Sequence, residues 1–125
     1  MPLPQPTDPF SSWLAALEAK HLADLTFAEV SRSLRALSAT YVERRQKLAE
    51  GAALSGRGKR AAFALFYGPL HYLIVAQIVR ALPDATRRVE MLFDLGCGTG
   101  AAGAAWASAL KPSPRIAGID IHPWA

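Results

Sequence analysis

Residues 91–100 read MLFDLGCGTG: a short apolar run, an acidic residue and three alternating glycines. The apolar run predicts a strand over residues 89–95, and the small residues that follow predict a helix over 100–110. Because glycine has no Cβ and tolerates positive φ, the loop between them would let the backbone approach a ligand closely. A loop in this position is the usual place for a nucleotide-like ligand in an open α/β sheet.

A second apolar run, residues 115–119, predicts another strand, and Asp120 stands at its end. The two strands and the helix between them form a βαβ unit, with parallel strands and a right-handed crossover. Two parallel strands do not make a stable layer alone. The sequence therefore predicts an α/β fold in which residues 85–125 are the incomplete start of a Rossmann-like sheet, truncated after its second strand.

The glycine loop fits two motifs. The stretch from Asp94 to Gly100 is D-x-G-x-G-x-G, whereas Gly98 to Gly103 also fits the dinucleotide pattern G-x-G-x-x-G. A dinucleotide would bring a doubly anionic pyrophosphate, which the carboxylate of Asp94 would repel. S-adenosylmethionine instead brings a sulfonium and an ammonium group, which Asp94 can bind directly or through water. Asp120 can accept hydrogen bonds from both ribose hydroxyls, as the acidic residue does in dinucleotide folds.

Residues 93–100 (FDLGCGTG) and 118–123 (GIDIHP), with the spacing between them, resemble the class I S-adenosylmethionine-dependent methyltransferases. The resemblance implies an enzyme with this cofactor, in which Ile121 packs on the adenine. No metal site is expected, because His21 has no identifiable partner for a zinc ion. An acceptor base would come from later loops, so no catalytic residue is named. The cofactor-binding residues expected on these grounds are Asp94, Gly96, Cys97, Gly98, Gly100, Asp120 and Ile121.

A narrower resemblance involves residues 36–48 (ALSATYVERRQKL) and 62–79 (AFALFYGPLHYLIVAQIV), ahead of the glycine loop. They are similar to the ribosomal small-subunit methyltransferase-like family of bacteria and mitochondria, which implies a role with rRNA or in ribosome assembly. The basic segment from Arg32 to Arg60 supports an RNA or ribosome partner, since residues 30–60 hold eight Lys or Arg against two Glu. A solvated helix face would explain the same charges.

The chain before the loop is predicted to be helical. Residues 1–10, with four prolines, read as a flexible Pro-rich tail, and residues 11–84 as a helical N-terminal region. Ser11 or Ser12 would cap a helix over 13–22. Thr26 and Glu29 fit a capping box for a helix over 27–49. Its apolar stripe would be Phe27, Val30, Leu34, Leu37, Tyr41 and Leu48.

Residues 61–79 carry no charge over nineteen positions, close to the length that spans a bilayer. Gly68 and Pro69 interrupt this stretch, so two shorter helices, 61–67 and 70–82, are expected, the second nearly fully buried. His71 would then be a partly buried core histidine. We therefore expect no membrane partner.

The single cysteine, Cys97, excludes an intrachain disulfide and favours a cytoplasmic protein. Cys97 could act as a nucleophile, but a small residue that fits the loop is the favoured interpretation. Two other functions stay open beside the methyltransferase. One is a non-enzymatic RNA- or ribosome-binding module with a vestigial cofactor loop, and the other is an NAD-dependent oxidoreductase, which Asp94 disfavours.

Overall fold

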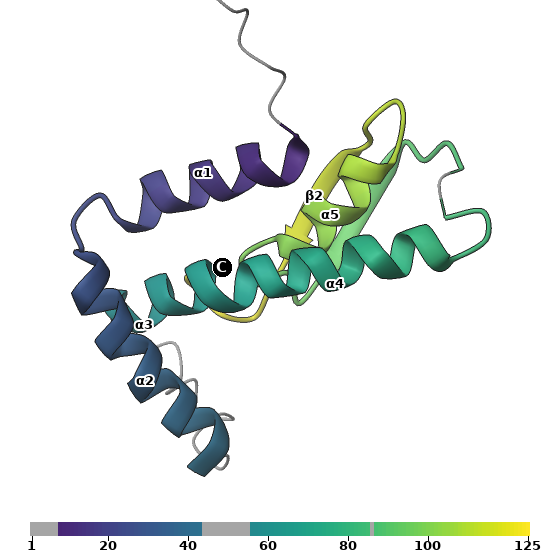
Figure 1. The fold of residues 1–125 in the computed structure, drawn as a ribbon. Coiled ribbons are helices and arrows are strands. Elements are labelled where there is room, and N and C mark those ends of the chain that lie inside the picture. The colour runs from purple at the N-terminus through teal and green to yellow at the C-terminus, as the bar shows by residue number, and fades with distance from the viewer. Residues whose placement is uncertain (1–7, 44–55, 86) are drawn as a thin grey trace, which may run out of the picture.

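The computed structural model describes residues 8–43, 56–85 and 87–125 (Figure 1). It combines helices with one small sheet, in agreement with a mixed α/β architecture. The elements in chain order are α1 (Pro9–His21), α2 (Phe27–Glu43), α3 (Arg57–Ala62), the π-helical turn η3 (Phe63–Tyr67), α4 (Gly68–Ala81), β1 (Met91–Leu95), α5 (Ala101–Ala109) and β2 (Arg115–Ile119).

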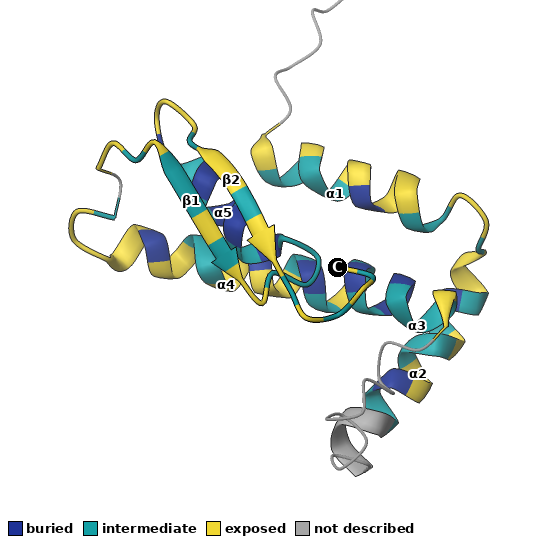
Figure 2. Ribbon diagram, turned by 180° about the vertical axis from the view of Figure 1, so that it is seen from behind, coloured by how far each residue is buried: buried dark blue, intermediate teal, exposed yellow. Residues whose placement is uncertain are grey.

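The two strands of the sheet are parallel, as the sequence predicted, with Met91 opposite Arg115 and Leu95 opposite Ile119. Helix α5 connects them. Helices α4 and α5 lie on the same face of the sheet, which leaves the other face open (Figures 1 and 2). On that open face Phe93 is 63% exposed and Leu95 is 77% exposed. The sheet is therefore covered on one side only by the described residues.

Helix α1 begins earlier than predicted. Asp8 is its N-cap and accepts a hydrogen bond from the backbone N–H of Ser11 at 3.1 Å, and Pro9 occupies the first turn. Ser11 and Ser12 are therefore not caps, because the Asp-Pro pair starts the helix: the carboxylate supplies the acceptor and proline has a fixed helical φ. The Pro-rich tail was predicted to reach residue 10, which is too far; residues 1–7 lie outside the described part.

The predicted capping box at the start of α2 is confirmed. The Glu29 Oε2 atom accepts from the Thr26 backbone N–H at 2.7 Å, and the Thr26 Oγ1 atom accepts from the Glu29 N–H at 3.3 Å. Two backbone donors that the helix itself cannot satisfy are thus paired. The Thr26 backbone N–H, and after it the Thr26 hydroxyl, which donates to the same carboxylate at 2.9 Å, hold the pKa of Glu29 below its ordinary value.

Replacing Thr26 with alanine should lower the free energy of unfolding by about 1 kcal/mol, since it removes the side-chain acceptor for the Glu29 N–H. Urea denaturation at pH 7 measures this loss. Ser12→Ala is the matched control, because Ser12 is exposed and makes no side-chain hydrogen bond within the described residues. An equal effect of the two substitutions would contradict the capping role.

The two helices predicted around Gly68 and Pro69 form one continuous helical segment, so that prediction was wrong. Between α3 and α4, residues 63–67 form a π-helical turn, in which the Gly68 N–H bonds to the Phe63 carbonyl. Proline has no N–H, and its ring crowds the carbonyl four residues earlier in a regular α-helix. The wider turn directly before Pro69 lets the helix continue through the proline.

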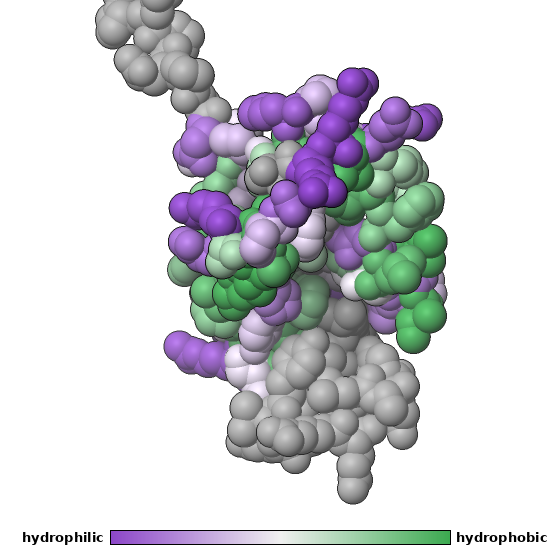
Figure 3. Space-filling model, turned by 90° about the vertical axis from the view of Figure 1, so that its right-hand side faces the viewer, coloured by the Kyte–Doolittle hydropathy of each residue, from purple (hydrophilic) through white to green (hydrophobic). Residues whose placement is uncertain are grey.

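Helix α4 is also far less buried than predicted. Tyr72 and Val79 are buried, but the large apolar residues on the outer side are about half exposed, and Figure 3 shows apolar side chains open at the surface. Helical residues 57–81 are long and apolar enough to cross a membrane by length and composition, and 28% of the most apolar window is buried. Core helices of soluble proteins meet the same criterion.

Two apolar clusters stabilise the described residues. In one, Val30 and Leu37 of α2 pack against Ala61 and Ala62 of α3. In the other, Tyr72 of α4 packs on α5, with Phe10 and Trp13 of α1 around it. The predicted stripe on α2 is right for Val30 and Leu37 but wrong for Phe27, which is 79% exposed. The Tyr41 side chain and Leu48 lie outside the described residues.

Candidate functional site

The loop between β1 and α5 requires its glycines. The φ angles of Gly96, Gly98 and Gly100 are +71°, +51° and +78°, all in the left-handed region that other residues rarely adopt. The backbone N–H groups of Gly96 and Cys97 both donate to the Ile119 carbonyl, at 2.7 and 3.2 Å. The loop is therefore held to the end of β2 by its own backbone.

Asp94, at the end of β1, is half-buried and points toward α5. Its Oδ2 atom accepts a hydrogen bond from the backbone N–H of Gly103 at 2.9 Å. A Cβ at position 103 would lie 2.9 Å from the same oxygen, so only glycine fits there without displacing the carboxylate. The sequence predicted a helix of small residues here and a possible dinucleotide motif that ends at Gly103, but not this contact between Gly103 and Asp94.

Asp120 ties the second strand to the loop. Its Oδ1 atom accepts from the His122 N–H at 2.8 Å, and its Oδ2 atom accepts from the Gly98 N–H at 2.9 Å. The two donors, of which the His122 N–H has the larger effect, hold the pKa of Asp120 below its ordinary value. The side chain is therefore ionised at neutral pH. Each carboxylate oxygen can accept a further hydrogen bond. Asp120 can thus orient the loop and still bind a diol.

A cavity of about 290 Å³ lies between the loop and the long helix. It brings together four of the seven predicted cofactor-binding residues, Asp94, Gly96, Cys97 and Gly98. Gly100 lines a neighbouring cavity, and Asp120 is connected through its bond to Gly98. Ile121 is fully exposed and packs on nothing in the described structure, so its predicted place beside an adenine is not formed here.

The helical wall of this cavity was not predicted. Phe63, the first residue of the π-helical turn, and His71 of α4 both line it, with their rings 6.3 Å apart. His71 is exposed, so the prediction of a partly buried histidine was wrong. Cys97 packs closely over Gly118, where a Cβ would lie 2.9 Å from its sulfur, in agreement with a small loop residue. The Gly68-Pro69 pair was the feature of the sequence that could have indicated this wall, because the π-helical turn that begins at Phe63 directly precedes it.

The predicted basic segment is only partly described. Arg32 and Arg35 are exposed on α2, whereas residues 44–55 lie outside the described residues. Arg57 and Arg60 of α3 line a separate cavity with Lys20 and Trp124. Helix α1 therefore adds a basic side chain, Lys20, to those of α3, and Trp124, which follows β2, lies beside them; the sequence did not indicate this arrangement.

Within the described ranges, no group of three or more His, Cys, Asp or Glu is placed to hold a metal ion. Comparison with protein-family models gave no match, and comparisons with curated proteins and with solved structures also gave none. The case for a function therefore depends on the geometry of the loop and on the motifs that form it.

Proposed function

We propose that the glycine loop binds S-adenosylmethionine and that the chain is the cofactor-binding part of a cytoplasmic class I methyltransferase with a Rossmann-like sheet. The observation that carries the proposal is the loop itself. Its three glycines all have positive φ, and a carboxylate stands at the end of each of the two parallel strands beside it.

The residues present suit this cofactor. Among the described residues, Asp94 uses only Oδ2 for a hydrogen bond, which leaves Oδ1 for an ammonium group. Asp120 keeps acceptor capacity for two ribose hydroxyls. The ligand has no pyrophosphate for Asp94 to repel. When bound, the cofactor supplies an electrophilic methyl group, and the loop would fix its position toward an acceptor. We place that acceptor in RNA, following the narrower resemblance.

Isothermal titration with S-adenosylhomocysteine tests the proposal. Wild type should show saturable binding, and Asp120→Ala should lose at least about tenfold in affinity, because it removes both the ribose acceptor and the bond to Gly98. Glu90→Gln is the control, since it removes an exposed carboxylate next to β1. Absence of binding by a folded chain, or saturation by NAD instead, would overturn the assignment.

Binding should also depend on the charge of Asp120. The hydrogen bonds from the His122 and Gly98 N–H groups hold the pKa of Asp120 in the folded chain below its ordinary value, so the carboxylate accepts hydrogen bonds from a ligand down to that ordinary value and loses this capacity when lower pH protonates it. We expect affinity for S-adenosylhomocysteine to be independent of this group between about pH 5 and 8 and to fall below about pH 4. Asp120→Asn should weaken this acid dependence, with circular dichroism at each pH confirming that the chain is folded. An unchanged acid limb in Asp120→Asn would show that another group is responsible.

A further inference from the structure

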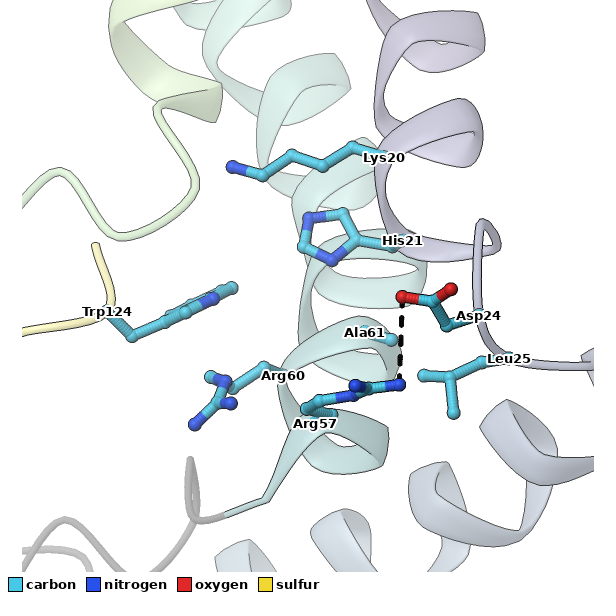
Figure 4. Close-up of a pocket in the computed structure, with 8 residues that line it drawn as sticks. All are labelled: Lys20, His21, Asp24, Leu25, Arg57, Arg60, Ala61 and Trp124. Atoms are coloured by element: carbon cyan, nitrogen blue, oxygen red, sulfur yellow. Dashed lines mark ion pairs between the residues drawn. The ribbon is translucent and has the colours of Figure 1, made fainter.

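A second cavity, of about 210 Å³, lies between α1, α3 and the residues after β2 (Figure 4). Three of its lining side chains, Lys20, Arg57 and Arg60, are cationic, and one, Asp24, is anionic. The cavity therefore carries a surplus of two positive charges when His21 is neutral. Burial, and then the charge of Lys20, lower the pKa of His21, so the ring is neutral at pH 7.

The positive charges are available to a ligand. Arg57 is 3.7 Å from Asp24, but both side chains are mostly exposed, so this pair is weak. Lys20 and Arg60 have no carboxylate partner in the part of the chain that the structure describes. Figure 4 shows their side chains extending toward the space on either side of Trp124.

Trp124 supplies a flat aromatic wall at the same cavity. Its ring lies 6.1 Å from that of His21 and 6.5 Å from that of Phe63, both in edge-on arrangements. Its backbone N–H donates to the Nδ1 atom of His122 at 3.2 Å. Trp124 has intermediate exposure, so part of the side chain stays open to the cavity beside these ring contacts.

We propose that this cavity binds a nucleotide unit, with the phosphate held by the cationic side chains of the cavity, Lys20, Arg57 and Arg60, and the base stacked on Trp124. A positively charged groove combined with an aromatic ring is the arrangement that binds single-stranded nucleic acid. An acidic peptide would use the cations but would have no planar base to stack on the indole of Trp124. The unit can belong to single-stranded RNA or to a free nucleotide, and the experiment below separates these sources.

The cavity shares a wall with another cavity that reaches the glycine loop. Lys20, His21 and Trp124 also line a neighbouring cavity of about 290 Å³, which reaches Gly98 and Thr99. A chain of nucleotides held at Trp124 could therefore extend toward the loop. This connection to methyl transfer rests on the proposed function, whereas the binding of the nucleotide does not.

Fluorescence anisotropy with a labelled single-stranded RNA of ten uridines tests the proposal. Trp124→Leu should weaken binding by about tenfold through loss of stacking. Arg60→Gln should reduce the slope of log affinity against log salt by about 0.7. The control Arg88→Gln removes the same charge at an exposed position outside the cavity and should leave affinity within about twofold.

Uridine monophosphate and inorganic phosphate serve as competitors. Displacement by the monophosphate at micromolar concentration identifies a free nucleotide, and displacement by RNA alone identifies a strand. Equal RNA binding by wild type, Arg60→Gln and Arg88→Gln would overturn the proposal, even if Trp124→Leu fails to fold. Titration of S-adenosylhomocysteine into Arg60→Gln separates the two sites, because this variant should bind it normally whether or not the RNA site is lost.

Discussion

Replacing Gly98 with alanine is expected to weaken the binding of S-adenosylhomocysteine about tenfold, or about 1.4 kcal/mol. The φ angle of Gly98 is +51°, and an L-residue in that region costs about 1–2 kcal/mol. A Cβ there would lie 3.7 Å from the Phe63 ring, an ordinary contact, so the penalty comes from the backbone. Relief of the strain would rotate the Gly98 N–H away from Asp120 and change the wall of the cavity.

Gly56→Ala provides the matched control for this experiment. Gly56 has a φ of +85° and a ψ of 147°, a conformation that L-residues rarely adopt, and open space around its Cβ position, so alanine also carries a backbone penalty there, outside the glycine loop. Both variants should lose thermal stability by differential scanning fluorimetry. Only Gly98→Ala should lose affinity by calorimetric titration. Parallel losses of affinity in the two variants would show that stability, and not the loop geometry, governs binding.

Local signals in the sequence were sufficient to predict the βαβ unit. The strand predicted over residues 115–119 has the same bounds as β2 in the structure. Prolines before this short segment and an aspartate after it leave little choice in where a strand can begin and end. The capping box gives the start of α2 for the same reason, since both partners lie within four residues. The start of α1 was missed because Asp8 was read as part of a proline-rich tail.

Burial was harder to predict than local structure. A helix with apolar residues on all sides was expected to be enclosed, yet Leu73 and Ile74 are 46% and 56% exposed. Periodicity shows which side chains favour burial but not whether a neighbouring element covers them. The same limit applies to Phe27, which has the right spacing but is the first residue of α2 and is 79% exposed.

The sequence predicted which carboxylates belong to the candidate site, but not the hydrogen bonds that they make. The motif identified Asp94 and Asp120 as functional carboxylates, and the structure gives both of them backbone partners, Gly103 for one and Gly98 for the other. These partners depend on how α5 and the loop pack, which spacing alone does not specify. The contribution of Lys20 and Trp124 to one cavity was invisible in the sequence, because about a hundred residues separate them.

Replacing Leu37 with alanine is expected to have the largest effect on stability. Leu37 is fully buried in the contact between α2 and α3, at 0% exposure. Truncation of a buried leucine costs about 2–5 kcal/mol, and the loss grows with the cavity that remains. Its neighbours Ala61 and Ala62 have short side chains fixed to α3, so they cannot extend into the space. We therefore expect a value in the upper half of that range.

Phe27→Ala separates burial from sequence pattern, because Phe27 shares the predicted stripe of Leu37 but is 79% exposed. Its free energy of unfolding in urea should change by less than about 0.5 kcal/mol. Domains of this size are stable by about 5–15 kcal/mol, so Leu37→Ala should remove a large part of the total.

Phe63 packs against the Leu37 cluster and also lines the cavity beside the glycine loop. If that link transmits the damage, Leu37→Ala should weaken S-adenosylhomocysteine binding even where the chain remains folded; unchanged affinity in the folded variant would show that the α2–α3 contact and the loop are independent.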